Sequence, residues 1–442
     1  MFGDKTPQVL IAGAGPVGLF TALCLARRGV GVRIVDTGIW GCTHSYALAL
    51  HAQALDLFRE VGLLDRVLGS SYLVKQWNLA DKDGMRARLA LDRDGADGVA
   101  VVRQDVLEAM LERALNELGV KVGWRQEVSK LENTADGVRA TTSRFEKESR
   151  GYAVAHTEWV IAGWSELDVP YVIGADGYNS RVRRALHYDF PELAPAEYYA
   201  VFEFAANTDL HHEMTLTLGD GSCDVLWPLP GGDARWSFRL PEHHDEAAEG
   251  VKDVLDRSGF GHFPTERIKD RMLRSEGERD ALLTDEHLHR LVAERAPWFD
   301  RAHIGAVSWR TVVRFERRLA TGFGHGPLWL AGDAAHLTGP AGIQSMNAGL
   351  QEGHDLAVAM AAILRDGASP TLLDGCAQRA TQMWRQLHGQ DGGLHAEAGC
   401  DPLIAAHAGE LLSCLPATGE ALGALAGQLG LAFAAHGAAR PV

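Results

Sequence analysis

The chain has 442 residues, enough for two or three domains with hydrophobic cores of their own, and its 46% hydrophobic content is typical of globular proteins. A formal net charge of −15 disfavours nucleic acid or an anionic membrane as a partner, because either would require a basic surface. Six cysteines form no C-x-x-C pair and show no metal-ligand spacing with histidine, which predicts scattered, reduced thiols and no metal site. The first eight residues do not resemble a signal peptide, so we expect a cytoplasmic protein.

Residues 9–36 predict a strand, a glycine-rich turn, a helix and a second strand. Gly13, Gly15 and Gly18 have the spacing G-x-G-x-x-G. In such a turn the first glycine permits a tight bend, the second lets the backbone approach a pyrophosphate, and the third lets the helix pack closely on the sheet. Asp36 ends the second strand, where a carboxylate can accept hydrogen bonds from the hydroxyls of an adenosine ribose. The unit predicts a dinucleotide site, with a purely structural turn as the alternative.

The next part of the chain predicts scaffold and a small sheet. A loop and helix are expected at 40–69, and a charged, weakly ordered stretch at 81–98. Arg103 follows a strand and precedes an amphipathic helix, where it can point toward a cofactor or act as a surface cap. Short β-prone runs at 128–172 predict a meander, which leads into the sequence GADGYNSRVRRAL at 174–186.

Residues 198–240 alternate between apolar and polar side chains like an open antiparallel sheet, which predicts a second domain. A charged, helical stretch at 245–300 follows, and a strand at 304–320 is expected to return the chain to the first domain. That domain closes with the segment 327–364, in which a strand ends at a Gly-Asp pair. The tail is mainly helical.

Three separated segments resemble the motifs of one family, the class A flavoprotein monooxygenases, the single-component aromatic hydroxylases typified by para-hydroxybenzoate hydroxylase. The segments are the glycine unit at 13–18, the Asp-Gly turn at 176–177, and LAGDAAHLTGPAGIQSMNAG at 330–349. Their order and spacing match over about the first 390 residues. Three motifs in register are far more specific than any one of them.

The resemblance implies an α/β fold with a Rossmann-like FAD-binding domain, a second antiparallel-sheet substrate domain and a helical C-terminal region. We predict a discontinuous FAD-binding domain at 1–190 and 304–365, a substrate-binding domain at 191–303 and the helical region at 366–442. Within that last region, the uncharged stretch at 421–439 is interrupted by glycines and polar residues. It therefore predicts a packed or oligomer-facing helix rather than a membrane span.

FAD is the cofactor that the resemblance implies, held by the glycine unit at its pyrophosphate and by Asp36 at its ribose. Arg103 would brace FAD, and Asp176 would lie near it, although Asp176 can equally be a helix cap. Asp333 can accept hydrogen bonds from ribityl hydroxyls, with a buried helix cap as its competing role. The loop after it leads into a helix whose dipole would stabilise a reduced flavin. The predicted cofactor contacts are Gly13, Gly15, Gly18, Asp36, Arg103, Asp176, Gly332, Asp333, Pro340, Gly342, Met346 and Asn347.

Three departures from the family pattern concern the flavin loop and its surroundings. Ile343 and Ser345 occupy places where the family loop usually has glycine, which predicts a stiffer loop. The family segment Gln-Asp-Ala-x-Asn-Leu is replaced by QEGHDL at 351–356. Tyr46 stands where many members carry an arginine that helps to place the flavin.

The reaction that the resemblance implies is NAD(P)H-consuming monooxygenation. NAD(P)H, a transient reductant, would reduce FAD, and a flavin hydroperoxide would transfer one oxygen atom of dioxygen to an aromatic or polyketide-like small molecule. A second glycine fingerprint for a resident nicotinamide is absent after Gly18. The alternatives are a flavin-dependent halogenase or reductase on the same scaffold, or a non-catalytic flavin-binding protein. Residues 226–230 (LWPLP) do not match the Trp-x-Trp-x-Ile-Pro block of the halogenases. We expect a monomer or homodimer without a nucleic acid or membrane partner.

Substrate contacts are expected on the inner face of the sheet at 198–240, which should cover the flavin. Aromatic or apolar side chains there can stack on a ring or simply pack in the core, and arginines can bind an acidic group or lie at the surface. These candidates are Phe202, Phe204, Trp227, Pro228, Arg235 and Arg239. The sequence assigns no catalytic residue. Candidates are His51, Tyr46 and Pro340, and His44 and His336 are further histidines that can deprotonate a phenol.

Overall fold

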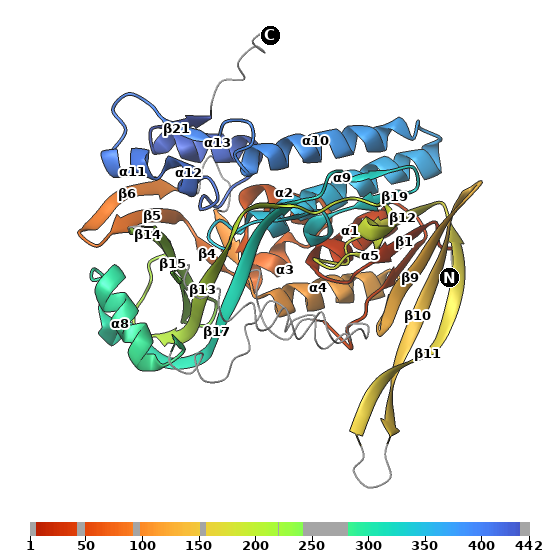
Figure 1. The fold of residues 1–442 in the computed structure, drawn as a ribbon, viewed down its shortest axis with the longest axis horizontal. Coiled ribbons are helices and arrows are strands. Elements are labelled where there is room, and N and C mark those ends of the chain that lie inside the picture. The colour runs from red at the N-terminus through yellow and green to blue at the C-terminus, as the bar shows by residue number, and fades with distance from the viewer. Residues whose placement is uncertain are drawn as a thin grey trace.

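Two large sheets organise the computed structural model, and Figure 1 shows them at opposite ends of the molecule with C-terminal helices along one side. The structure describes residues 6–41, 49–91, 98–150, 156–219, 221–241 and 282–433. Within these residues, one sheet has six strands in the order β18-β19-β12-β1-β2-β8, and we call it the parallel sheet. The other has eight strands in the order β20-β17-β13-β16-β15-β14-β5-β6, and we call it the large sheet.

The parallel sheet contains the predicted glycine unit. All its neighbouring strands run parallel except the edge pair β18–β19. Its strands are β1 (Val9–Ala12), β2 (Val32–Val35), β8 (Val122–Gly123), β12 (Tyr171–Gly174), β18 (Gly324–His325) and β19 (Leu328–Leu330). Strand β1 is buried throughout because structure covers both faces of the sheet. Its residues Val9 and Ile11 face helices α1 (Pro16–Arg27), α4 (Gln104–Glu117) and α9 (Gln344–Asp366), which form one hydrophobic cluster with them.

The large sheet confirms the predicted antiparallel sheet and extends it. Its strands are β5 (Gln76–Asp81), β6 (Gly84–Ala90), β13 (Glu192–Ala206), β14 (Glu213–Gly219), β15 (Ser222–Pro228), β16 (Asp233–Arg239), β17 (Ile304–Leu319) and β20 (His336–Leu337). Hairpin β5–β6 corrects the expectation of weak order at 81–98, of which residues 92–97 lie outside the described residues. Among its charged side chains, Arg86 and Arg88 are exposed on β6, an edge strand.

Strand membership crosses the predicted domain bounds. Strand β17 pairs with β13 over most of its length, so the chain at 304–319 is part of the large sheet, as are β5 and β6. Strand pairing alone does not divide the chain into domains, so the domain bounds at 1–190, 191–303 and 304–365 stay a prediction. Of the helical stretch expected at 245–300, helix α8 (Asp285–Arg295) is described and residues 242–281 are not.

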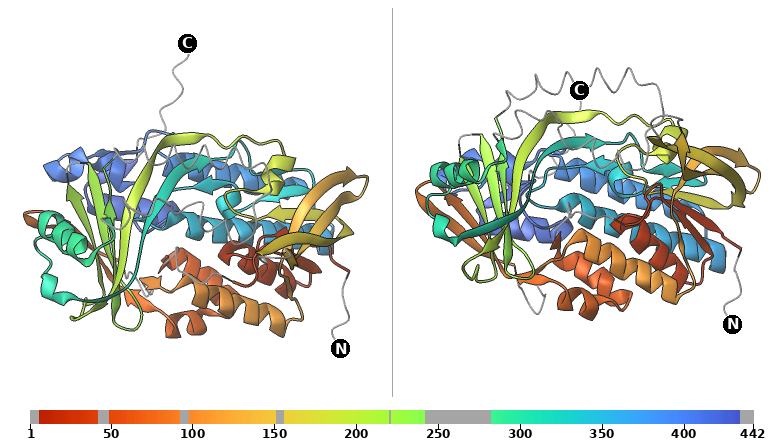
Figure 2. Two further views of the ribbon diagram at one scale, coloured as in Figure 1. Left: turned by 60° about the horizontal axis from the view of Figure 1, so that its bottom comes forward. Right: turned by 90° about the horizontal axis from the view of Figure 1, so that it is seen from below.

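Smaller elements complete the first half of the fold. The predicted meander is a three-stranded sheet that projects from the body (Figures 1 and 2). It consists of β9 (Gln126–Thr134), β10 (Gly137–Arg150) and β11 (His156–Val169). The remaining elements are β3 (Ala49–Leu50), α2 (Ala52–Glu60), α3 (Leu64–Gly69), β4 (Tyr72–Val74), β7 (Val99–Val101), α5 (Arg181–Ala185) and the 3-10 turns η3 (Arg301–His303) and η4 (Gly332–Ala334).

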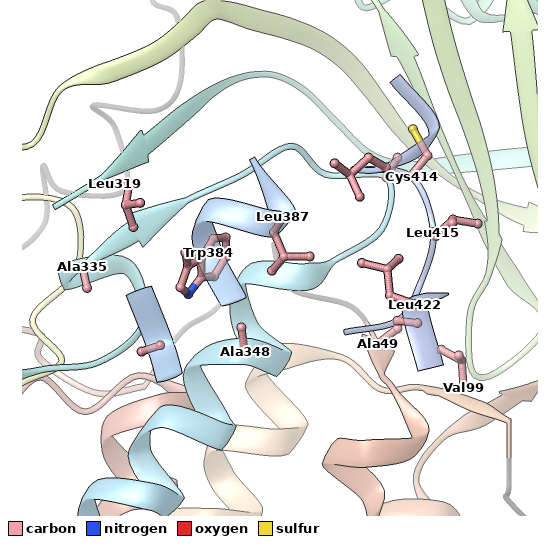
Figure 3. Packing of buried hydrophobic residues seen from close by; sticks show 14 of the residues in the cluster. Ala49, Val99, Leu319, Ala335, Ala348, Trp384, Leu387, Cys414, Leu415 and Leu422 are labelled. Carbon is pink, nitrogen blue, oxygen red and sulfur yellow. The ribbon is translucent and has the colours of Figure 1, made fainter. Parts of the chain in front are cut away.

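The C-terminal region packs against α9 and joins the two sheets. It contains α10 (Thr371–Leu387), β21 (Leu394–Ala396), α11 (Pro402–Ala406), α12 (Ala408–Leu411), α13 (Gly419–Gln428) and β22 (Leu431–Phe433). Figure 3 shows Trp384 from this region near Ala348 of α9, and Leu422 near Ala49, all in one hydrophobic cluster. The stretch at 421–439 is thus a packed helix followed by a strand as far as it is described. Across the described segments, we find no helix with the length and apolarity to span a bilayer.

Candidate functional site

The three glycines of the turn differ in their surroundings: the fold requires two of them, and the third faces open space. Gly13 has φ +102°, and a Cβ there would lie 2.1 Å from the carbonyl oxygen of Ala175. A Cβ on Gly18 would lie 2.0 Å from the carbonyl oxygen of Gly13. Gly15 has an ordinary φ of −73°, and its added Cβ would meet no atom within 4 Å. The fold itself requires Gly13 and Gly18, whereas Gly15 leaves room at the N-terminus of α1, where a phosphate binds well.

Asp36 lies against this turn. Its Oδ2 accepts a hydrogen bond of 2.7 Å from the backbone N–H of Ala14, and its Oδ1 accepts one of 2.5 Å from Gly38. The carboxylate at the end of β2 is therefore held next to the glycine unit, as a ribose contact would require.

The third segment reaches the same edge of the parallel sheet. Ala12, Gly174 and Leu330 are register partners across β1, β12 and β19, so the turns that follow these strands lie side by side. Gly332 has φ +66°, and the Cα of Gly332 lies 2.9 Å from where a Cβ on Gly349 of α9 would be. The three segments recognised in the sequence thus converge at one sheet edge, where open parallel sheets bind their ligands.

A buried network holds the turn that contains Asp333. The carboxylate of Glu352 accepts hydrogen bonds from the backbone N–H of Gly332 at 2.9 Å and from the indole of Trp384 at 2.6 Å. Its Oε2 also lies 2.8 Å from Nε2 of His336. Ser345 Oγ is 3.3 Å from the other nitrogen of His336 and donates to Asp333 Oδ1 at 3.1 Å. His336 is fully buried in this network, which favours a positioning role for it.

Asp176 contacts the start of helix α5, whose N-cap is Ser180. Its Oδ2 accepts a hydrogen bond of 2.6 Å from the backbone N–H of Arg181, the first residue of α5. Arg183, which the sequence did not single out, donates from α5 to the carbonyl oxygens of Ala334 at 2.7 Å and Tyr178 at 2.6 Å. Burial lowers the pKa of Arg183 to about 10. This arginine ties the Asp-Gly turn to the Gly-Asp turn.

The loop before α9 is held from two sides. Gly342 donates to the carbonyl oxygen of Ser413 at 3.0 Å, and a Cβ on Gly342 would lie 2.6 Å from that oxygen. Ile343 has φ +50°, a left-handed conformation that costs energy for a β-branched residue. Asn347 accepts from the backbone N–H of His51 at 2.8 Å and donates to Ile343 at 2.8 Å. The loop is held by hydrogen bonds to the C-terminal region and to His51, the N-cap of α2, and its stiffness stays a prediction.

His51 is built into this loop support. Its Nε2 lies 2.9 Å from the carbonyl oxygen of Gly342, so Nε2 carries the proton and donates. Burial lowers the pKa of His51 to about 4, which leaves it neutral near pH 7. A buried imidazole tied to the backbone favours a positioning role over the general-base role considered from the sequence. Tyr46 and His44 lie outside the described residues, and Met346 is buried in the cluster of α1 and α9.

A cavity separates the loop from the inner face of the large sheet. It measures about 30 Å³, and its walls include Val201, Trp227, Arg235, Trp309, Pro340 and Ile343. Trp227 and Arg235 are register partners on β15 and β16, so both point inward. Pro340 also lines a smaller neighbouring cavity beside Arg239. The structure therefore brings Trp227, Arg235 and Pro340 together, with Arg239 next to them.

Phe202 and Phe204 require a correction. In β13 they alternate with Glu203, which is the register partner of Arg235, whereas Phe202 is paired with Trp236. Side chains of successive strand residues point to opposite faces, so both phenylalanines face away from the cavity. They pack with Leu288 of α8 in a separate cluster. Pro228 is paired with Ala234, a member of that same cluster.

Arg103 is the N-cap of α4. Its guanidinium donates to Glu203 at 2.8 Å and to Asp233 at 3.1 Å, so in this structure it contacts the large sheet. The second oxygen of Glu203 accepts from Arg235 Nε at 3.0 Å. Burial raises the pKa of the Glu203 carboxyl, but Arg235 and Arg103 outweigh burial and bring that pKa below its usual value. Glu203 is thus an ionised, buried partner of two arginines, and the sequence did not single it out.

The smaller cavity brings together groups from distant parts of the chain. Arg239 lies 3.6 Å from Glu197, and Arg317 donates to the same carboxylate at 3.2 Å. Cys223 of β15 and Cys414 have their sulfur atoms 2.9 Å apart, and both side chains are buried. The expectation of scattered cysteines is wrong for this pair.

The fold and site define a dinucleotide-binding α/β protein whose nucleotide edge is flanked by the inner face of a large antiparallel sheet. The chain belongs to the FAD binding domain family, whose profile matches residues 6–390. FAD is accordingly its cofactor.

Curated relatives are aromatic and polyketide monooxygenases. The chain is 28% identical over 379 residues to 6-methylpretetramide 4-monooxygenase of Streptomyces rimosus, covering 83% of this chain and 58% of the relative. It is 24% identical over 392 residues to pentachlorophenol 4-monooxygenase of Sphingobium chlorophenolicum, covering 86% of this chain and 62% of the relative. The chain therefore spans about three fifths of the length of these relatives.

Solved structures share the fold. The p-nitrophenol 4-monooxygenase PnpA from Pseudomonas putida DLL-E4 aligns with a TM-score of 0.67 and 20% identity, over 95% of this chain and 92% of that one. OxyS anhydrotetracycline hydroxylase from Streptomyces rimosus aligns with a TM-score of 0.60 and 23% identity, over 86% of this chain and 66% of that one. At these identities the likeness establishes the fold.

Proposed function

We propose that this protein is an FAD-dependent monooxygenase that consumes NAD(P)H and inserts one oxygen atom of dioxygen into an aromatic or polyketide-like small molecule. The observation that carries the proposal is the convergence of three segments at one sheet edge, the third of which supplies Pro340 to a cavity also lined by Trp227 and Trp309. The relatives' names support the same reaction class.

The residues present fit FAD. Gly15 leaves an open approach to the N-terminus of α1, whose backbone N–H groups and dipole favour a pyrophosphate. Asp36 would hold the ribose, and Asp333 would hold the ribityl chain. His51 contributes one further sign of a ligand, because its buried Nδ1 has no hydrogen-bond partner among the described residues. When bound, FAD would supply the redox chemistry, by accepting hydride from NAD(P)H and activating dioxygen.

The chain's own contribution is positioning and exclusion of water. The N-terminus of α9 would favour negative charge on a bound reduced flavin. Neutral His51 and Asn347 keep the loop at 340–343 in one conformation through their hydrogen bonds. The tryptophans would hold an aromatic ring and keep water from the reacting atoms. Because the cavity of about 30 Å³ holds only a water-sized group, the ring enters with a movement of these side chains.

The test is reconstitution of the purified chain with FAD. We expect a yellow protein whose NADPH or NADH oxidation accelerates with a phenolic substrate and yields a product heavier by one oxygen atom. A colourless protein that refuses added FAD would contradict the proposal. A bound flavin that NAD(P)H cannot reduce would instead support a non-catalytic flavin-binding protein, and a product mass that depends on added halide would support a halogenase.

A further inference from the structure

The main cavity has a single charged wall. Among the described residues that line it, Arg235 is the only charged one, and the others are apolar or aromatic apart from Ser237. The Arg235 side chain is 6% exposed, and its guanidinium carbon lies 5.7 Å from the ring centroid of Trp309. Whether the cavity attracts anions therefore depends on the charge of Arg235 together with that of its partners.

That charge is already compensated by Glu203. Both Nε and Nη2 of Arg235 donate to Glu203 Oε1, and the carboxylate side chain is 5% exposed. Hydrogen bonds between charged groups such as these are stronger than hydrogen bonds between neutral groups. The charge of Arg235 at the cavity wall is thus neutralised by Glu203.

The surrounding charges keep this balance. As the structure stands, Arg103 and Arg235 face Glu203 and Asp233, so two cations meet two carboxylates. If the Arg103 side chain turned toward FAD, the ion pair between Arg235 and Glu203 would remain. An aromatic carboxylate that approached Arg235 would meet a cation whose charge Glu203 already compensates, and displacing Glu203 would leave a buried carboxylate with one partner fewer, which is costly.

We propose that Glu203 is a specificity-determining residue, which makes the cavity select uncharged aromatic rings over aromatic carboxylates. The inference rests on the proposed function, because it takes the cavity as the substrate site. Glu203 acts through Arg235 and is therefore a positioning residue. Replacing it by glutamine would remove the negative charge and leave one acceptor oxygen in a side chain of similar size, so the cavity wall would become cationic.

The experiment compares two ligands of similar size, 3-hydroxybenzyl alcohol and 3-hydroxybenzoate. Their dissociation constants are measured on the FAD-loaded protein from the change in the flavin absorbance spectrum, at low ionic strength. We expect the wild type to bind the alcohol at least about tenfold more tightly, and E203Q to gain about tenfold or more in affinity for the benzoate, a gain that added salt reduces. The affinity of E203Q for the alcohol should change much less.

Asp224 provides a matched control. It is another buried carboxylate of the large sheet, paired with Arg295 at 3.2 Å on the side of α8, away from the cavity. D224N should leave the preference between the two ligands at the wild-type value. An E203Q protein that retains FAD but keeps the wild-type preference would overturn the inference.

The wild-type protein alone also tests the inference, even if the E203Q variant does not fold. A wild type that binds 3-hydroxybenzoate as tightly as the alcohol contradicts the role of Glu203 and leaves the proposed function standing. An FAD-loaded wild type that binds no aromatic ring in this cavity removes the proposed function and the inference with it.

Discussion

Gly15→Ala separates cofactor binding from folding. Gly15 is the N-cap of α1 with φ −73° and ψ −177°, a conformation open to alanine, and its added Cβ would meet nothing within 4 Å. Alanine is a poorer N-cap than glycine, by some tenths of a kcal/mol to about 1 kcal/mol. It also lowers the entropy of the unfolded chain, a gain of about 0.4–1 kcal/mol. The two effects nearly cancel, so the free energy of unfolding of the apoprotein should change by less than about 1 kcal/mol.

FAD affinity should respond differently to the same change. The new methyl group would occupy the space where the pyrophosphate approaches the backbone, so we expect FAD to bind at least about tenfold more weakly, or about 1.4 kcal/mol. The assay pairs urea unfolding of the apoprotein with a titration by FAD followed through flavin fluorescence.

The controls are two other glycines. Gly423→Ala in α13 also has open space around its Cβ, and should leave FAD affinity unchanged while stabilising the helix by about 1 kcal/mol. Gly13→Ala should destabilise the fold itself, because of its φ of +102° and its 2.1 Å contact. If Gly15→Ala bound FAD as tightly as the wild type, the glycine turn would not be the pyrophosphate site.

Three further predictions concern the groups around the site. Glu352→Gln should weaken FAD binding about tenfold, because the carboxylate accepts at both oxygens, from Gly332 at Oε2 and from Trp384 at Oε1, whereas an amide has one acceptor oxygen. Asp355→Asn on the same helix, which accepts from Arg379 of α10, should have no such effect, and equal losses would refute the network. Asp333→Ala should lose FAD more readily than Asp366→Ala at the exposed end of α9, and equal retention would remove Asp333 from the site. His51 is neutral in the fold with a pKa of about 4 but protonates near 6.5 when unfolded, so its contribution is complete above pH 6.5 and is lost as the pH falls toward 4. Urea unfolding should show a loss of roughly 3 kcal/mol over that interval, smaller in His51→Asn, and an identical pH dependence in that variant would contradict the shifted pKa.

Short sequence patterns predicted the nucleotide-binding edge of the parallel sheet well. The positions of Gly13, Gly15 and Gly18 encode a turn whose backbone geometry is set within a few residues, and Asp36 follows from the length of one helix and one strand. The structure adds that the three glycines differ, because the need for Gly13 depends on Ala175, far along the chain.

Long-range pairing could not be predicted in the same way. Alternation shows that β13 has two faces but not which face meets α8, so Phe202 and Phe204 were placed on the wrong one. Glu203 meets an arginine 100 residues earlier and another 32 residues later, and one sequence carries no sign of either contact. The same holds for Glu352, whose neighbours come from three separate elements.

The most direct test of the account is the fate of isotopically labelled dioxygen. The FAD-loaded protein is incubated with NADPH, an uncharged phenolic substrate and oxygen-18 gas, and the product is weighed by mass spectrometry. The account predicts a product that carries one oxygen-18 atom and forms only when FAD and reductant are both present. Complete consumption of NADPH with no label in any product, or label arriving from water, would contradict it.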